Sequence, residues 1–376
     1  MKYSSKNITR VFIINVWVLV VLGLFALASA SMILAKTQFN DPYYYLKQQF
    51  IKGVLIGIVF FIIAYLLPLN FYKKTAPFFF VASLILVILL FTPLGMELNN
   101  ARRWLHIGPI VFQPNELLKL AFILYLSLWL SKKSSKEKNS FATIFAFLFY
   151  LVIIGFPMFL EPATSSLIIL LAASCIVFFA SGIKMKYMLI TILITCLILG
   201  LAYIALKNLK PQDYRLQRIV QYLNFHKSGG QVNAQDKNYQ LNQAVMAIGS
   251  GGLKGVGFGQ GVIKYNNYLP EPMGDSIFAI IAQEFGFIGS IILVILYLNL
   301  FLHGVKISIN ASDEFCKLAS LGIISLMMIQ MIIHIAAISG IFILTGQPLP
   351  LISYGSTNLV ILLTSLGIVA NISKYS

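Results

Sequence analysis

Charged residues are scarce in this chain. They make up 11% of its 376 residues, against 59% hydrophobic residues, and acidic residues are the rarest, with 12 Asp and Glu facing 28 Lys and Arg. A soluble protein of one or two domains is excluded, because too little polar surface is present to cover a core of that size. The formal net charge is +16, but the basic residues are spread over short segments without a recognition pattern of interleaved aromatics. We therefore expect no nucleic-acid partner and attribute the charge to membrane topology and anionic lipid.

Cysteine and histidine are too sparse and too scattered for a metal cluster or a disulfide framework. The three cysteines lie in apolar runs or beside a Lys-bearing loop, and the four histidines lie in four different segments; these residues are Cys175, Cys196, Cys316, His106, His226, His303 and His334. Neither set has the spacing of a zinc site. The cysteines are interpreted as buried apolar residues.

Long apolar runs are what the chain has in abundance. A helix crosses a hydrocarbon core of roughly 30 Å with roughly 20 residues. Runs near that length lie at 11–34, 48–68, 75–93, 115–131, 141–159, 165–180, 187–206, 276–303, 317–343 and 357–373. We predict an all-α polytopic membrane protein of about ten transmembrane helices, in which residues 1–376 form a single integral-membrane domain.

Lysines concentrate in alternate short segments between these runs. They lie near the N-terminus, at 73–74, at 132–138, at 184–186, and at Lys306 and Lys374. The positive-inside rule then places both termini in the cytoplasm. The same rule places segments 36–47, 94–114, 207–275 and 344–356 outside, with the large extracytoplasmic loop 207–275 between helices 7 and 8. The cytoplasmic segments are too short for an ATPase, so any catalysis faces outward.

The outer segment before the fourth run concentrates charge at a membrane face. Its candidate substrate-binding residues are Arg102, Arg103, Trp104, Gln113, Glu116 and Lys119. Glu116 and Lys119, at i and i+3, share a helix face one turn into the apolar run. Ionisable residues inside a membrane are functional candidates. The alternative is that Lys119 snorkels to the interface and the two arginines anchor to headgroups.

Residues 213–223 have the pattern of an interfacial amphipathic helix. Four apolar side chains fall on one helical stripe, and Arg215 and Arg218 lie on its flank. Two interpretations are equally compatible with this spacing. The arginines clamp a lipid pyrophosphate through bidentate hydrogen bonds, or they hold the helix against anionic lipid.

A glycine-rich stretch and an acidic loop follow. Residues 247–261 match a dinucleotide-binding glycine pattern only by chance, because no βαβ unit can surround them. Their glycines indicate tight turns or close backbone approach, with an anion-binding nest as the alternative. Glu271 and Asp275 lie in a Pro/Gly-shaped loop directly before the eighth run. Asp275 suits an N-cap, and both carboxylates suit general-base chemistry at the bilayer surface.

The last outer segment, 347–357, carries hydroxyl groups and two prolines. Ser353 and Tyr354 are its candidate site residues, because some of these polar groups are expected to face a cavity.

Taken in order, these motifs resemble the SEDS family (shape, elongation, division and sporulation proteins) over nearly the whole chain. The matching segments are 100–104, 113–119, 214–218, 247–259, 268–279 and 345–355. Three departures stand out. Residues 273–276 read Met-Gly-Asp-Ser instead of the family's His-Thr-Asp-Phe, Ser356 replaces a glycine, and Ala163 replaces an aspartate. Glu161, two residues earlier, is a candidate to replace that aspartate.

The resemblance implies a peptidoglycan glycosyltransferase that polymerises lipid II at the outer face of the cytoplasmic membrane. It makes Asp275 the catalytic base and lets Arg102, Arg103, Arg215, Arg218 and Lys119 balance the pyrophosphate, with Mg²⁺ or Mn²⁺ as a candidate cation and no organic cofactor. It implies a class B penicillin-binding transpeptidase and other membrane proteins of the division or elongation machinery as partners. The motifs look more like the division branch (FtsW type) or its sporulation relative than the elongation branch (RodA type). A lipid II flippase and a non-catalytic scaffold that activates the transpeptidase remain the alternatives.

Overall fold

The computed structural model describes residues 5–98, 101–108, 110–161, 163–209, 214–227, 239–261 and 269–375. The predicted outer loop 207–275 therefore lies partly outside the described residues. The elements are α1 Ser5–Phe39, α2 Tyr44–Gln48, η1 Gln49–Leu55, α3 Ile56–Leu66, α4 Leu69–Ile88, η2 Leu89–Phe91, β1 Gly95–Leu98, β2 Ala101–Ile107, β3 Ile110–Phe112, α5 Pro114–Ser131, α6 Ser135–Lys138, α7 Phe141–Leu160, α8 Thr164–Ala180, α9 Met185–Leu209, α10 Tyr214–Lys227, α11 Tyr239–Ser250, α12 Ile277–Asn310, α13 Glu314–Ile338, α14 Ser356–Ile372 and η4 Ser373–Tyr375.

Helix covers every predicted apolar run. Within the described residues, seven helices are long and apolar enough to cross a membrane. They are Asn7–Phe39, Tyr44–Leu66, Leu69–Phe91, Phe141–Leu160, Ile277–Asn310, Glu314–Ile338 and Ser356–Tyr375. The helices α5, α8 and α9 coincide with the other three runs. The ninth run was predicted to extend to residue 343, but its helix, α13, ends at Ile338. The helix ends there because Gly340 takes a positive φ of 77° and the amide of Ile341 donates to the carbonyl of Ala336.

The expectation of an all-α chain is wrong in one place. Segment 94–114 contains a three-stranded antiparallel sheet in the order β1-β2-β3. Its residues alternate as a half-buried strand requires, since Leu105 is fully buried while its neighbour His106 is exposed. Trp104 lies opposite Met96, and Arg102 lies opposite Glu97. The sheet caps the bundle at the entrance of α5.

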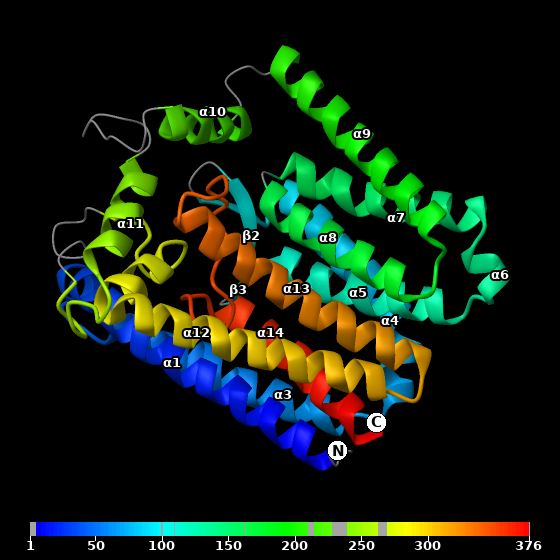
Figure 1. Ribbon diagram of the computed structural model, residues 1–376, viewed down its shortest axis with the longest axis horizontal. Helices are drawn as coiled ribbons and strands as arrows, with labels where there is room; N and C mark the ends of the chain where they lie inside the picture. Colours follow the sequence, from blue (N-terminus) through cyan, green and yellow to red (C-terminus); the bar gives the residue numbers. More distant parts are fainter. Residues whose placement is uncertain are drawn as a thin grey trace.

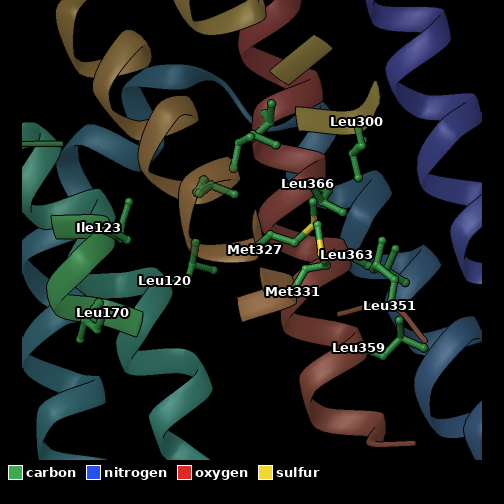
Figure 2. Close-up of a cluster of buried hydrophobic side chains, with 14 of the residues drawn as sticks. Leu120, Ile123, Leu170, Leu300, Met327, Met331, Leu351, Leu359, Leu363 and Leu366 are labelled. Atoms are coloured by element: carbon green, nitrogen blue, oxygen red, sulfur yellow. The ribbon is translucent and has the colours of Figure 1, made fainter. Parts of the chain in front are cut away.

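The helices pack around α13 as a central element. This helix contacts α5, α8, α12 and α14, while α14 packs against α3 and α1 packs against α12. Figure 2 shows part of this core, where Met327 and Met331 of α13 lie beside Leu363 and Leu366 of α14. Because these side chains are almost completely buried, their apolar contacts hold α13 and α14 against each other.

The two ends of the bundle differ in what they carry. The chain termini lie at one end (Figure 1), where Thr9 Oγ donates to Ser373 Oγ at 2.9 Å and Lys73 pairs with Asp313 at 2.9 Å. The sheet, α10 and α11 lie at the opposite end. The segments that the sequence assigned to one side of the membrane therefore gather at one end of the molecule.

A sharp bend in α12 receives the glycine-rich stretch. Gly286 has a φ of 64°, and the amides of Val256 and Gly257 donate to the carbonyls of Gln283 and Glu284 at 3.0 Å each. A Cβ on Gly255 would lie 2.1 Å from the carbonyl oxygen of Glu284. The glycine density is thus explained by close backbone approach, as the structural interpretation of this stretch predicted.

Candidate functional site

Asp275 lies in a tight loop just before α12. The N-cap of α12 is Ser276, and its side chain makes no cap hydrogen bond; the interpretation of Asp275 as the cap is therefore wrong. The loop is closed by its own backbone, because the amides of Gly274 and Ser276 both donate to the carbonyl of Glu271 at 3.2 Å. Glu271 itself adopts a φ of 47°, a strained conformation for a residue other than glycine. The Asp275 carboxylate is consequently free of a structural capping role.

Segment 344–355 packs against this loop. The amide of Tyr354 donates to the carbonyl of Met273 at 2.9 Å, and Ser353 Oγ donates to the carbonyl of Gly274 at 2.8 Å. Ser353 Oγ also accepts from the amide of Leu349 at 2.8 Å. Two sequence candidates, Ser353 and Tyr354, thus come together with Asp275, and Ser353 positions the loop that carries it.

Arg218 joins the site from α10. Its Nη1 donates to the carbonyl of Leu344 at 3.1 Å, and Tyr222, one turn later, donates to the carbonyl of Ile341 at 3.0 Å. These bonds hold α10 against the segment that leads to Gly346. Arg215 lies in the same helix, and its side chain falls outside the described part of the structure.

Asp275 opens onto a small polar cavity, here called the Asp275 cavity. Its volume is about 70 Å³, and its polar lining comprises Arg218, Gln221, Gln240, Asp275, His334, Thr345 and Gln347. Three helices, α10, α11 and α13, and two loop segments, the one that carries Asp275 and the one that follows α13, therefore converge on one space. Convergence of a carboxylate, a guanidinium and amides in a concavity is typical of a ligand site.

The electrostatics of the loop favour a base that works near neutral pH. Burial raises the pKa of Asp275 to about 6, and the nearby Glu271 carboxylate adds to the rise, whereas the positive charges of Arg218 and Arg103 oppose it. A carboxylate with a pKa of about 6 is a better proton acceptor than an ordinary aspartate and is still largely ionised at pH 7.

The two arginines of β2 point to different partners. Arg102 pairs with Glu97 at 3.2 Å at an exposed position, while the positive charge of Arg103 acts on both Asp275 and Glu161. This split follows from the alternation of side chains along a strand. The structure thus brings Arg103 toward the Asp275 site and leaves Arg102 at the sheet surface, with Trp104 half-buried beside Met96.

Glu116 and Lys119 form the predicted ion pair, but inside the bundle. Lys119 Nζ lies 2.8 Å from Glu116 Oε1, and both side chains are only 5% exposed. Lys119 also donates to Gln330 Oε1 at 3.4 Å, and Gln330 Nε2 donates to the carbonyl of Pro348 at 2.9 Å. The pair therefore reaches the 344–355 segment through one amide. This burial rules out the snorkelling interpretation of Lys119.

Gln113 lies at the start of α5 rather than at the Asp275 cavity. It is the N-cap residue of that helix in an extended conformation, without a side-chain cap bond. Its carbonyl accepts from the amide of Glu116 at 3.3 Å. In the described structure its visible role is to begin the helix that carries the ion pair.

Asn115 and His334 are buried polar residues that the sequence analysis did not propose for the site. Asn115 Nδ2 donates to Glu161 Oε1 at 2.9 Å, and burial raises the pKa of Glu161 to about 7 against the effects of that bond and of Arg103. His334 lies in the middle of an apolar helix, only 1% exposed, and lines the Asp275 cavity. A histidine in a transmembrane run was the signal for His334.

The described residues do not form a metal site built from protein ligands alone. Among the described residues, no group of three or more His, Cys, Asp or Glu side chains is placed to hold an ion. Asp275 and Glu271 could supply the one or two protein ligands that Mg²⁺ commonly takes when phosphate oxygens and water supply the others.

Comparisons with known proteins agree on one family. The family model described as "Cell cycle protein", which covers the FtsW, RodA and SpoVE proteins, matches residues 9–376. The chain is 31% identical to Stage V sporulation protein E of Bacillus subtilis over 379 residues, which covers 100% of this chain and 99% of the relative. It is also 31% identical to the probable peptidoglycan glycosyltransferase FtsW of Geobacter metallireducens, over 99% of this chain and 97% of that one.

Two solved structures share the fold. A chain from a study of "structural coordination of polymerization and crosslinking by a peptidoglycan synthase complex" superposes with a TM-score of 0.77 at 23% identity, covering 96% of both chains. The rod shape determining protein RodA of Thermus thermophilus superposes with a TM-score of 0.69 at 22% identity, covering 96% of this chain and 95% of that one.

Proposed function

Because this chain belongs to the SEDS family, we propose that it is a peptidoglycan glycosyltransferase that polymerises lipid II into glycan strands at the outer face of the cytoplasmic membrane. The observation that carries the proposal is the placement of Asp275, which has a raised pKa and faces a polar cavity that it shares with Arg218. Curated relatives that match the chain end to end are named as probable enzymes of this kind.

The proposed reaction joins an acceptor sugar hydroxyl to C1 of a donor sugar held as a lipid pyrophosphate. Asp275 accepts the hydroxyl proton as the oxygen attacks C1, and the bond between C1 and the pyrophosphate oxygen breaks. A positioned base is typically worth about 10² to 10⁴ in rate. Because attack and departure occur on opposite faces of C1, the configuration at this carbon inverts.

Positive charge is needed where the pyrophosphate leaves. Arg218 and Arg103 suit this role, because both act electrostatically on Asp275 and hence lie near the reacting atoms. Arg102, Trp104 and Arg215 are proposed to bind more distant parts of the lipid-linked substrate. A divalent cation such as Mg²⁺ or Mn²⁺ would add charge there, with Glu271 among its ligands.

The proposal includes an orientation and partners. Ten membrane spans with both termini in the cytoplasm place the Asp275 end outside, where lipid II sugars and a class B penicillin-binding transpeptidase meet the enzyme. One fold neighbour comes from a peptidoglycan synthase complex, which supports such a partner. Relatives with division and sporulation names match equally well at 31% identity, so assignment to the division branch rests on the motifs.

A flippase is the second candidate, because the charged residues Glu116 and Lys119 lie inside the helix bundle. Their pairing with each other at 2.8 Å argues against this candidate, since a closed ion pair does not form an open charged path. The test that separates the activities uses purified protein and labelled lipid II, with and without the transpeptidase. Glycan polymer from the purified protein supports the enzyme. Lipid II that crosses vesicle membranes without polymerising supports the flippase. Activation of the transpeptidase by a protein that makes no polymer supports the scaffold.

A further inference from the structure

Two residues that line the Asp275 cavity, His334 and Gln347, each carry a buried side-chain atom without a hydrogen-bond partner in the part of the chain that the structure describes. His334 Nε2 and Gln347 Oε1 are both buried, and neither atom has a hydrogen-bond partner within the described structure. Their side chains are 1% and 7% exposed, respectively, and both line the cavity. Buried acceptors are costly when unsatisfied, by about 1–3 kcal/mol each, so their persistence beside a cavity points to a ligand.

The tautomer of His334 is fixed by its other nitrogen. Nδ1 lies 2.6 Å from the carbonyl oxygen of Gln347, and a carbonyl can only accept. Nδ1 therefore carries the proton, and in the neutral imidazole Nε2 presents a lone pair. Gln347 is held in the same way, because its Nε2 donates to Ser166 Oγ at 3.0 Å and leaves Oε1 as the available atom.

The charges around the cavity select a neutral donor over a cation. Asp275 contributes one negative charge, and Arg218 contributes one positive charge to the same lining. A cation would meet the guanidinium of Arg218, whereas a hydroxyl or an amide N–H would satisfy both acceptors without adding charge. The volume of about 70 Å³ exceeds the order of 15 Å³ that a single water needs, but it is too small for a whole sugar ring.

We infer that His334 and Gln347 form an acceptor subsite that binds a neutral hydrogen-bond donor of the acceptor sugar, a hydroxyl other than the attacking one or the N–H of an acetamido group. This inference rests on the proposed function and names residues that orient its substrate. Docking that donor beside Asp275 holds the attacking hydroxyl within reach of the carboxylate. His334 and Gln347 are thus positioning residues, and neither exchanges a proton with the reacting atoms.

The test is a double-mutant cycle that combines changes to the acceptor substrate with a substitution of His334. Purified protein receives labelled lipid II as donor and a lipid-linked acceptor without pyrophosphate, which cannot act as donor. One series of acceptors lacks single non-reacting hydroxyls, and a second series has the acetamido N–H replaced. For the natural protein, one acceptor should lose about 5- to 100-fold in kcat/KM. For His334→Phe, that same acceptor should react as fast as the complete one, because the partner atom is already gone.

Two variants control for folding and chemistry. His334→Gln keeps an acceptor near the position of Nε2 and should restore the discrimination at least in part. His303→Phe is the matched control, since His303 also contacts a carbonyl through Nδ1, that of Asn299 at 2.8 Å, but it does not line the cavity. It should leave the discrimination unchanged. Size-exclusion profiles report whether each variant is folded.

The outcomes distinguish failure of the acceptor subsite from failure of the proposed glycosyltransferase function. If the natural protein makes no polymer, the proposed function fails. If it makes polymer but discriminates equally before and after His334→Phe, the subsite inference fails alone. The inference is also overturned if His334→Phe only raises the Mn²⁺ concentration needed for half-maximal rate, because the acceptors would then ligate a cation. The series that responds identifies the donor as hydroxyl or acetamido.

Discussion

Gly346 leaves open the space beside the Asp275 carboxylate. A Cβ on Gly346 would lie 3.2 Å from Asp275 Oδ2 and 3.5 Å from Arg218 Nη2. Gly346 also has a φ of 61°, which favours glycine. The backbone of the 344–355 segment therefore forms one wall of the site, and its conformation controls how closely the carboxylate and the guanidinium can approach.

Gly346→Ala should lower polymerisation more than it lowers stability. The added methyl would crowd Asp275 Oδ2 and require that carboxylate to shift by a few tenths of an ångström, while the methyl's distance of 3.5 Å to Arg218 Nη2 is an ordinary contact. A displacement of that kind in a catalytic group reduces the rate. We expect at least a tenfold fall in kcat, with a stability cost of about 1 kcal/mol from the positive φ. Gly182→Ala is the matched control, because Gly182 has a φ of 86° with open space around its Cβ position. Equal activity losses in the two variants would contradict the steric explanation.

Asp275→Asn should abolish most polymerisation while leaving the fold intact. Ser276, not Asp275, is the N-cap of α12, so changing the Asp275 carboxylate to an amide removes no capping interaction. The amide of the variant cannot accept a proton. The rate should fall by about 10² or more, while thermal stability and binding of lipid II persist. Asp41→Asn is a carboxylate-to-amide control at an exposed ion pair with Lys47. A near-natural rate for purified Asp275→Asn would move the search for the base to Glu271.

The rate should rise with pH through about 6 and level off above it. Asp275 acts as a base only when ionised, and its pKa is raised to about 6. Glu271 raises that pKa and Arg218 lowers it. Glu271→Gln should therefore move the half-maximal pH downward, and Arg218→Gln should move it upward, when kcat is measured across the range. Shifts in the same direction for both variants would show that another group titrates.

Topology can be tested with a pair of cysteine variants. Lys254 is exposed in the glycine-rich stretch at the Asp275 end, and Lys136 is exposed in α6. In a background without the native cysteines, a membrane-impermeant thiol reagent added outside should label Lys254→Cys and not Lys136→Cys. Labelling of Lys136→Cys alone would reverse the orientation and place the Asp275 cavity in the cytoplasm.

The helices could be predicted from sequence because membrane helices carry their own signal. Each apolar run became helix, since lipid provides no partner for an unsatisfied backbone. The strands β1 to β3 were missed because short polar segments have no comparable constraint. Their alternation spans seven residues in β2, which is too short to stand out among loops.

The site was only partly predictable for a similar reason. Asp275, Arg218 and Arg103 were named from motifs, and the structure brings them together. His334 was read only as evidence against zinc, because its value depends on Nδ1 meeting the carbonyl of Gln347, which lies 13 residues away. Contacts of that kind are set by how α13 ends and by how the next segment folds back. Local sequence patterns do not encode them.

The Glu116–Lys119 pair yields the last prediction, since its burial changes what its loss should do. The sequence analysis named Lys119 as a candidate substrate-binding residue, for which substitution would lower activity more than folding. Both partners are 5% exposed, and removing one partner of a buried pair leaves an uncompensated charge at a cost of about 3–5 kcal/mol. We now expect Lys119→Met to lower the yield and thermal stability of folded protein, together with activity.

The double variant separates structural from substrate roles. Glu116→Gln with Lys119→Met removes both charges, and replacing a buried pair by neutral groups is often close to neutral in stability. Stability should therefore recover in the double variant. Lys47→Met, which breaks the exposed pair with Asp41 at 2.7 Å, is the control and should cost about 0–1 kcal/mol. If activity returns along with stability, the pair holds α5 in place beneath the site. If stability returns and activity does not, Lys119 or Glu116 acts on the substrate itself.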